Sequence, residues 1–253
     1  MAPFYIMLVG AFKPNASLIT IPADLIPVKG FTLKNIQIVF EKSEILLWLK
    51  NSMIVSVSVA IATAFIGVTA GYAFAKINFK GKNILFMMVM ATMMMPKQML
   101  LIPNYLVAYN LKLQDTMIGL ILTSIAPAFG VFLSRQFITS LPGTLFEAAE
   151  IDGCNRWSIL WRIIFPQSKA AILTIVIYSI QGHWNAFMEP LIYLNTMEKF
   201  TVTLGLSFFK GQFGTQWGLL MAASVMVVLP ILLLFVVAQK QFVQGIVVSG
   251  VKG

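Results

Sequence analysis

The 253 residues are 58% hydrophobic and only 11% charged, whereas ordinary soluble domains contain roughly 25% charged residues. This composition excludes an ordinary soluble domain and indicates a protein of the lipid bilayer. The formal net charge of +9 does not indicate nucleic-acid binding, because the basic residues are scattered singly between apolar runs and form no patch. The single cysteine, Cys154, excludes an internal disulfide and a Cys-rich metal cluster.

The chain begins with an apolar segment, residues 1–12, that has about half the length a spanning helix requires. We expect a short or truncated first span there. A signal peptide is not expected, because no basic residue precedes the segment and no small-residue cleavage site lies before Lys13. Residues 13–47 contain three prolines and are expected to form an exposed extracytoplasmic segment.

Five later stretches are apolar enough to be predicted as spans two to six. Four of them lack Asp, Glu, Lys and Arg, as a crossing of about 20 apolar residues requires. They lie between Lys50 and Lys76, Asp115 and Arg135, Lys169 and Glu189, and Lys210 and Lys240. Span three is predicted from Asn83, and it continues past Pro96 because Lys97 can snorkel and the apolar run resumes at 99–102. The sequence therefore predicts an all-α membrane protein, a polytopic bundle of five to six transmembrane helices.

The connections between the spans predict which side of the membrane each occupies. A basic turn, residues 76–82, a long amphipathic loop, residues 138–168, and the tail, residues 239–253, are expected in the cytoplasm. Residues 190–216 are expected to form an extracytoplasmic loop. Basic residues are equally numerous on the two sides, so this orientation rests on their position in short loops, where the positive-inside rule applies best.

The long loop contains the sequence signals of a helix, a turn and a second helix. Ser140 can cap the first helix, with Pro142 in its first turn. Gly153 suits the left-handed position that ends this helix, and Asn155 can cap the second helix.

The first of these helices is predicted to have two different faces. On a helical wheel Leu145, Ala148 and Ala149 gather on one side, while Glu147 and Glu150 lie on the other. From the pattern alone, a helix resting at the membrane interface and a docking element are equally good interpretations.

The loop resembles the EAA loop of ABC importer permeases, whose pattern is Glu-Ala-Ala, three residues, Gly, and an apolar stretch ending near a Pro. Glu147, Ala148, Ala149, Gly153 and Pro166 match this pattern. In that family the loop is the coupling helix, which sits in a cleft of the cytoplasmic ATPase and carries its closure into the membrane helices. The resemblance implies the same role here for Phe146, Glu147, Ala148, Ala149, Glu150, Asp152 and Gly153.

The resemblance covers nearly the whole chain and favours the carbohydrate branch of that family, which includes the maltose-type permeases. The segments that carry it include 70–75, 79–82, 95–98, 102–105, 132–137, the pair Trp184 and Asn185, and the tail 241–253. It implies a transport subunit of the inner membrane that forms the path for a sugar or oligosaccharide. The implied partners are a second, homologous permease in a heterodimer, two ATPase subunits, an extracytoplasmic solute-binding protein and membrane lipid.

We expect no catalytic residue, cofactor or metal in this chain. No Gly-rich phosphate loop ending in Gly-Lys-Ser or Gly-Lys-Thr occurs in the sequence, so ATP hydrolysis is expected in a separate subunit. The methionine-rich run 87–95 could bind Cu(I), but with no Cys or His beside it we interpret it as adaptable packing. The remaining functional alternative is a self-contained secondary carrier or channel for a small polar solute.

Two features near the end of span five are candidates for contact with the transported solute or with protons. Trp184 and Asn185 could contact a sugar, since aromatic faces stack on sugars and amides bond hydroxyls, or they could anchor the helix at the interface. His183 and Glu189 could form a proton relay, but we do not expect one because both lie near the predicted interface.

Overall fold

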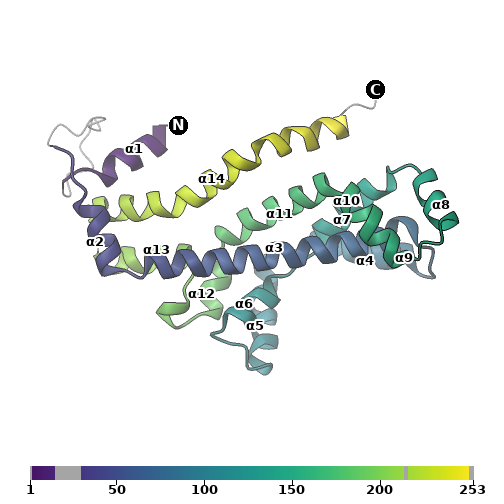
Figure 1. Cartoon of the computed structure of the whole chain (residues 1–253). Helices are drawn as coiled ribbons and strands as arrows, with labels where there is room; N and C mark the ends of the chain where they lie inside the picture. Colours follow the sequence, from purple (N-terminus) through teal and green to yellow (C-terminus); the bar gives the residue numbers. More distant parts are fainter. Residues whose placement is uncertain (1, 15–29, 214–215, 251–253) are drawn as a thin grey trace. The chain divides into compact units, whose positions relative to one another are not determined.

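The computed structural model describes residues 2–14, 30–213 and 216–250. Helices and turns make up this part of the chain, and no strand occurs in it. The α-helices are α1 (Ala2–Ala11), α2 (Lys34–Lys42), α3 (Ile45–Lys76), α4 (Lys82–Met93), α5 (Leu101–Asn110), α6 (Met117–Ser124), α7 (Ala128–Thr139), α8 (Thr144–Ile151), α9 (Arg156–Ile159), α10 (Phe165–Gln167), α11 (Lys169–Trp184), α12 (Met188–Tyr193), α13 (Val202–Phe213) and α14 (Trp217–Gly250) (Figure 1). Short 3-10 turns at Lys97–Leu100 and Met197–Lys199 and a π-helical turn at Leu160–Ile164 complete the described elements. The prediction of an all-α fold is confirmed.

Two helices are long and apolar enough to cross a membrane by themselves, Ile45–Lys76 in α3 and Trp217–Val236 in α14. Three bent helix pairs qualify when each pair is counted as one span, which gives up to five crossings in the described chain. α1 is a shorter apolar helix of ten residues.

The predicted third span is not a straight helix. α4 ends at Met93, and the helical segment that resumes at Lys97 is bent from it by 98°. The cause is Pro96, which has an extended ψ of 127° and disfavours helical geometry in the residue before it. A smaller bend, of 46°, separates α6 from α7 at Pro127. Apolar length located both spans but does not predict such bends.

Three segments predicted to lie outside the spans contain helix. The 190–216 segment holds the end of α12 and all of α13 up to Phe213. The predicted tail continues α14 as far as Gly250, and 251–253 lie outside the described residues. In the 13–47 segment α2 and the start of α3 are helical, while 15–29 lie outside the described residues.

The described residues form two units, each with its own packing. The first comprises Met1–Val55, Gln114–Leu120 and Trp184–Val237, and the second comprises Ser56–Leu113, Ile121–His183 and Ala238–Gly253.

In the first unit, polar side chains at the start of α3 hold the chain that leads into α13. Trp48 donates its indole N–H to the Met197 carbonyl oxygen at 3.0 Å, and the Ser52 hydroxyl oxygen accepts the Val202 N–H at 2.8 Å. The Trp48 ring packs so closely on Gly205 that a Cβ there would lie 2.2 Å from it. Gly205 is therefore required by packing.

In the second unit, α3 and α7 cross with almost no side chain between them. Gly67 and Gly71 lie one turn apart on the same face of α3, opposite Gly130 and Ser134 of α7. A Cβ on Gly67 would lie 2.9 Å from the Gly130 carbonyl carbon, and one on Gly71 would lie 2.5 Å from the Ser134 Cβ. Small residues at such spacing let membrane helices pack backbone to backbone, and this crossing positions the end of α7 from which the long loop departs.

Candidate functional site

The long loop leaves α7 through a turn that differs from the predicted cap. The Ser140 hydroxyl donates to the Phe137 carbonyl oxygen at 2.7 Å, so this side chain closes the end of α7. The residue at the N-cap of α8 is Gly143. The prediction of a Ser140 cap on α8 was wrong, because a serine hydroxyl bonds as readily to a carbonyl three residues back as to a following N–H.

The turn between α8 and α9 is the one that the sequence predicts. Gly153 has a φ of +75° and donates its N–H to the Glu150 carbonyl oxygen at 3.0 Å, while Cys154 donates to the Ala149 carbonyl oxygen at 2.9 Å. These two bonds are the Schellman arrangement that ends a helix on a left-handed residue. The Asn155 side-chain oxygen accepts the Ser158 N–H at 2.8 Å and caps α9.

The inner face of α8 packs into an apolar cluster within the second unit. Ala149 is 5% exposed and is the α8 residue at its centre. The other buried members come from the ends of α3 and α7 and from the helical segment that follows α8: Val68, Tyr72, Ile138, Ile159, Leu160 and Ile164. α8 is therefore anchored to membrane helices by side chains distant in sequence, and Ala149 contacts its own chain.

A cation strengthens this anchor at the edge of the cluster. The Lys76 ammonium group lies 4.4 Å from the centre of the Phe146 ring and donates to the Leu141 carbonyl oxygen at 3.2 Å. A cation over an aromatic face contributes about 0.5–1 kcal/mol at partly exposed sites. The sequence indicates only that Lys76 belongs to a basic turn, because a contact with Leu141, 65 residues away, leaves no local signal.

The outer face of α8 is both acidic and apolar. Glu147, Ala148, Glu150 and Asp152 are exposed, and Ile151 is 86% exposed. Leu145, Ala148 and Ala149 lie at i, i+3 and i+4 of α8, the predicted common side, but only Ala149 is buried, while Leu145 and Ala148 are exposed. Neighbouring helix residues differ in direction by about 100°, so one alanine packs inward and the next one faces outward.

The first unit contains a polar cluster around Asp115 that was not predicted from the sequence. The Asp115 carboxylate accepts the backbone N–H groups of Asn195 and Thr196 at 2.9 and 3.1 Å and also the Thr196 hydroxyl. Lys199 donates to one carboxylate oxygen at 2.8 Å and to the Asp115 carbonyl oxygen at 2.7 Å. Burial acts to raise the pKa of Asp115, but these hydrogen bonds outweigh it and hold the pKa well below its usual range.

Trp184 and Asn185 lie where α11 ends. Trp184 is 2% exposed, with its indole N–H donated to the Val227 carbonyl oxygen at 3.2 Å. Asn185 is exposed. Their contact with a sugar stays a prediction.

The ring nitrogens of His183 lie against backbone carbonyl oxygens. Nδ1 is 2.7 Å from the Ser179 oxygen and Nε2 is 3.3 Å from the Ser124 oxygen. These contacts hold the ring between α11 and Ser124, and the expectation against a relay stays a prediction.

The methionine-rich run does not fill the interior of this chain. Met87, Met88 and Met93–Met95 are all exposed, Met94 by 86%, so the interpretation of the run as adaptable packing between helices stays a prediction. Within the described residues no group of three His, Cys, Asp or Glu side chains could hold a metal ion.

Comparison with known proteins identifies the family. Residues 63–248 match the model described as "Binding-protein-dependent transport system inner membrane component". The chain is 34% identical to the arabinooligosaccharides transport system permease protein AraQ of Bacillus subtilis, over 99% of this chain and 90% of that protein. It is 29% identical to the sn-glycerol-3-phosphate transport system permease protein UgpE of Shigella flexneri, over 98% and 90%.

The fold also matches a solved structure. A chain of a bacterial ABC transporter involved in the import of the acidic polysaccharide alginate aligns with a TM-score of 0.83 at 23% identity, covering 94% of this chain and 89% of that one. Family, relatives and fold agree, and we conclude that this chain belongs to the inner membrane components of binding-protein-dependent transport systems and is a permease subunit of an ABC importer.

Proposed function

We propose that this chain pairs with a second, homologous permease to form the membrane path for a sugar or oligosaccharide handed over by a solute-binding protein. The relatives support the substrate class, since AraQ is named for arabinooligosaccharides and the matching structure for alginate import. Asn185, exposed at the end of α11, is the proposed contact with the solute, and the buried Trp184 positions it.

We propose further that α8 is the coupling helix, docked in a separate ATPase that supplies the energy. The observation that carries this proposal is the division of α8 into an anchored inner face and an exposed outer face. Ala149 and Phe146 pack on the ends of the membrane helices, so a push on α8 reaches them directly. The exposed acids and Ile151 lie outside the apolar cluster of the described chain, so they could meet a partner.

Charge reversal at Glu147 tests the docking. Glu147 is exposed and belongs to no apolar cluster, so Glu147→Lys is expected to leave the fold intact. Reversing a charge in a docked interface costs several kcal/mol, and we expect at least a tenfold loss of ATPase co-purification and of substrate-stimulated ATP hydrolysis in proteoliposomes. Glu44→Lys, an equal change at another exposed position, is the matched control.

Gly153→Asp is a second variant, because an L residue is strained at a φ of +75° and the turn that presents α8 would shift. If both variants keep ATPase association and uptake at the level of Glu44→Lys, the coupling role of α8 is refuted. Uptake that proceeds without any ATPase would instead support the self-contained carrier.

The substrate class is tested separately. Neutral oligosaccharides are added to the transporter, and the stimulation of ATP hydrolysis is compared between wild type and Asn185→Ala.

A further inference from the structure

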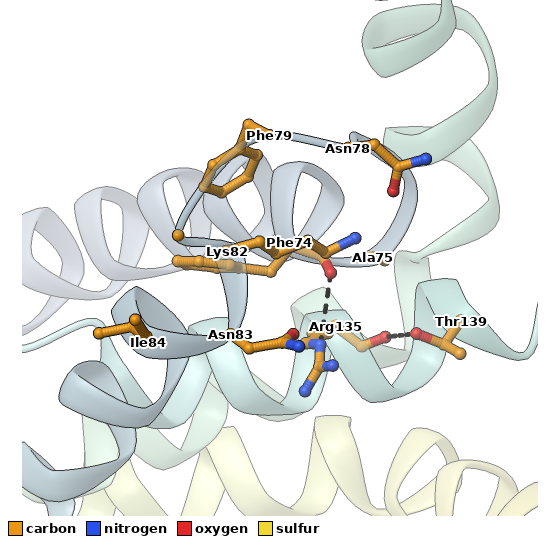
Figure 2. A pocket seen from close by; sticks show the side chains of 10 residues that line it. Phe74, Ala75, Asn78, Phe79, Lys82, Asn83, Ile84, Arg135 and Thr139 are labelled. Atoms are coloured by element: carbon orange, nitrogen blue, oxygen red, sulfur yellow. Dashed lines mark hydrogen bonds between the residues drawn. The ribbon is translucent and has the colours of Figure 1, made fainter.

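A pocket of about 600 Å³ lies beside the basic turn of the second unit. Figure 2 shows that its side chains come from three segments: the end of α3, the turn with the first residues of α4, and the last turns of α7. The lining residues are Phe74, Ala75, Asn78, Phe79, Gly81, Lys82, Asn83, Ile84, Arg135 and Thr139. None of them belongs to the outer face of α8.

Two cations line this pocket and no carboxylate does. Arg135 donates its Nε–H to the Phe74 carbonyl oxygen at 3.4 Å and stacks its guanidinium group 3.8 Å from the centre of the Phe86 ring. These contacts fix the guanidinium group and leave its terminal N–H groups to other acceptors. In the described part of the chain the one ion pair is Lys199 with Asp115, so neither Arg135 nor Lys82 is neutralised by an acid.

The start of α4 adds backbone donors to the same pocket. α4 has 12 residues, and its N-cap, Gly81, has a φ of +81° and no side chain that could accept an N–H group. The Lys82 N–H donates to the Phe79 carbonyl oxygen at 3.3 Å, which leaves the N–H groups of Asn83 and Ile84 as donors. Asn83 and Ile84, in the first turn, also line the pocket. Free N–H groups at a helix N-terminus favour anions, and phosphate in particular, so backbone and side chains favour the same kind of ligand.

The surface next to the pocket is apolar. No residue of α4 is buried, and Ile84, Leu85 and Met88 are 57%, 47% and 59% exposed. A ligand with a phosphate group in the pocket and acyl chains along α4 would satisfy both surfaces. Basic pockets at the ends of membrane helices bind lipid headgroups in this way.

We propose that this pocket binds the phosphate group of an anionic membrane phospholipid, held by Arg135, Lys82 and the N-terminus of α4. The pocket lies on the same side of the membrane as α8, because Lys76, at the end of α3, contacts Leu141 and Phe146. The proposal rests on the proposed function only in assigning the lipid to the cytoplasmic leaflet.

The test is lipid binding to the delipidated, assembled transporter in detergent, with phosphatidylglycerol, phosphatidylcholine and inorganic phosphate as separate probes. We expect saturable binding of phosphatidylglycerol at least tenfold tighter than that of the other two. Each basic residue near an anionic lipid contributes about fivefold in affinity. Lys82→Gln should therefore weaken phosphatidylglycerol binding about fivefold, and Lys82→Gln with Arg135→Gln about 25-fold.

Lys80→Gln is the matched control, since Lys80 is an exposed cation in the same turn that does not line the pocket. Its phosphatidylglycerol affinity should stay within twofold of wild type. Lys82→Gln leaves both contacts of Arg135 in place, so it remains informative if the double variant fails to assemble. Equal loss in Lys80→Gln and Lys82→Gln, or phosphatidylcholine binding as tight as phosphatidylglycerol binding, would overturn the proposal.

Inorganic phosphate binding as tightly as the lipid would overturn the lipid assignment too. The readout needs no transport and no ATP hydrolysis, and it can be repeated on the permease subunit alone. Failure of the coupling role of α8 would therefore leave this result unchanged.

Discussion

The α8 anchor in the second unit and the Asp115 cluster in the first unit are held by different forces. The α8 anchor buries apolar side chains from several helices, with a single cation, Lys76, at its edge. The Asp115 cluster consists of hydrogen bonds and one ion pair, with the Asp115 side chain 22% exposed and that of Lys199 41% exposed. Apolar burial resists salt and pH, whereas a partly exposed charge cluster does not. The two regions should therefore fail under different conditions.

The largest expected effect is in the apolar anchor. Ile138 is fully buried in the cluster, so Ile138→Ala should leave a cavity and destabilise the subunit by about 3 kcal/mol. Thermal unfolding followed by tryptophan fluorescence would measure the change. Ile151→Ala, the same substitution at an 86% exposed position, should cost less than about 0.5 kcal/mol. Equal destabilisation by the two variants would show that the cluster does not hold α8.

A smaller effect is expected at the charge cluster. Asp115→Asn keeps an oxygen acceptor and suits the left-handed backbone, with a φ of +51°, but removes the charge that faces Lys199. We expect a loss of about 1.5 kcal/mol, seen as faster hydrogen exchange at 194–199 with no change at 156–164. Exchange that rises equally in both segments would contradict the separation of the two regions.

Lowering the pH should weaken the Asp115 cluster and leave the α8 anchor unchanged. Because the pKa of Asp115 is lowered in the folded protein from its ordinary value of 3.8, its carboxylate contributes stability that is fully present above about pH 4. This contribution is lost as the pH falls from there toward the folded pKa. Protection of 194–199 should decline over this range in wild type and stay flat in Asp115→Asn. A decline of equal size in the variant would assign the effect to another group.

The smallest effect is expected at Lys76. Lys76→Met keeps the length of the side chain and removes the charge over Phe146 and the bond to Leu141. The loss should be about 1 kcal/mol, with a weaker coupling of ATP hydrolysis to substrate measured in proteoliposomes. Lys80→Met, at an exposed position in the same turn, is the control. An unchanged response in Lys76→Met would show that this contact does not transmit force from α8.

Local sequence signals predicted some parts of this chain well and others poorly. Gly153 and Asn155 were predicted correctly, because a left-handed C-terminus and an N-cap depend on neighbouring backbone atoms only. Ser140 was predicted wrongly because its hydroxyl has two local partners of similar strength. Apolar intervals located the membrane helices, but Pro96 bends the third one by 98°.

Long-range contacts could not be predicted from one sequence. Asp115 served only to delimit a span, although it binds residues 80 positions away. Arg135 likewise marked the end of a span, and its pocket depends on the fold of three segments. The helical wheel correctly predicted that Glu147 and Glu150 lie on the outer face of α8. It could not predict that the apolar cluster buries Ala149 and leaves Ala148 exposed.

The crossing of α3 and α7 limits where this subunit can flex. Gly67, Gly71 and Gly130 contribute no side chain to the crossing and Ser134 only a short one, so few rotamers can rearrange when one helix is displaced. A displacement applied to the end of α7 is therefore transferred to α3 as rigid motion. The nearest break in helix geometry is at Pro127, the N-cap of α7, so we expect bending there and not within the α3–α7 crossing.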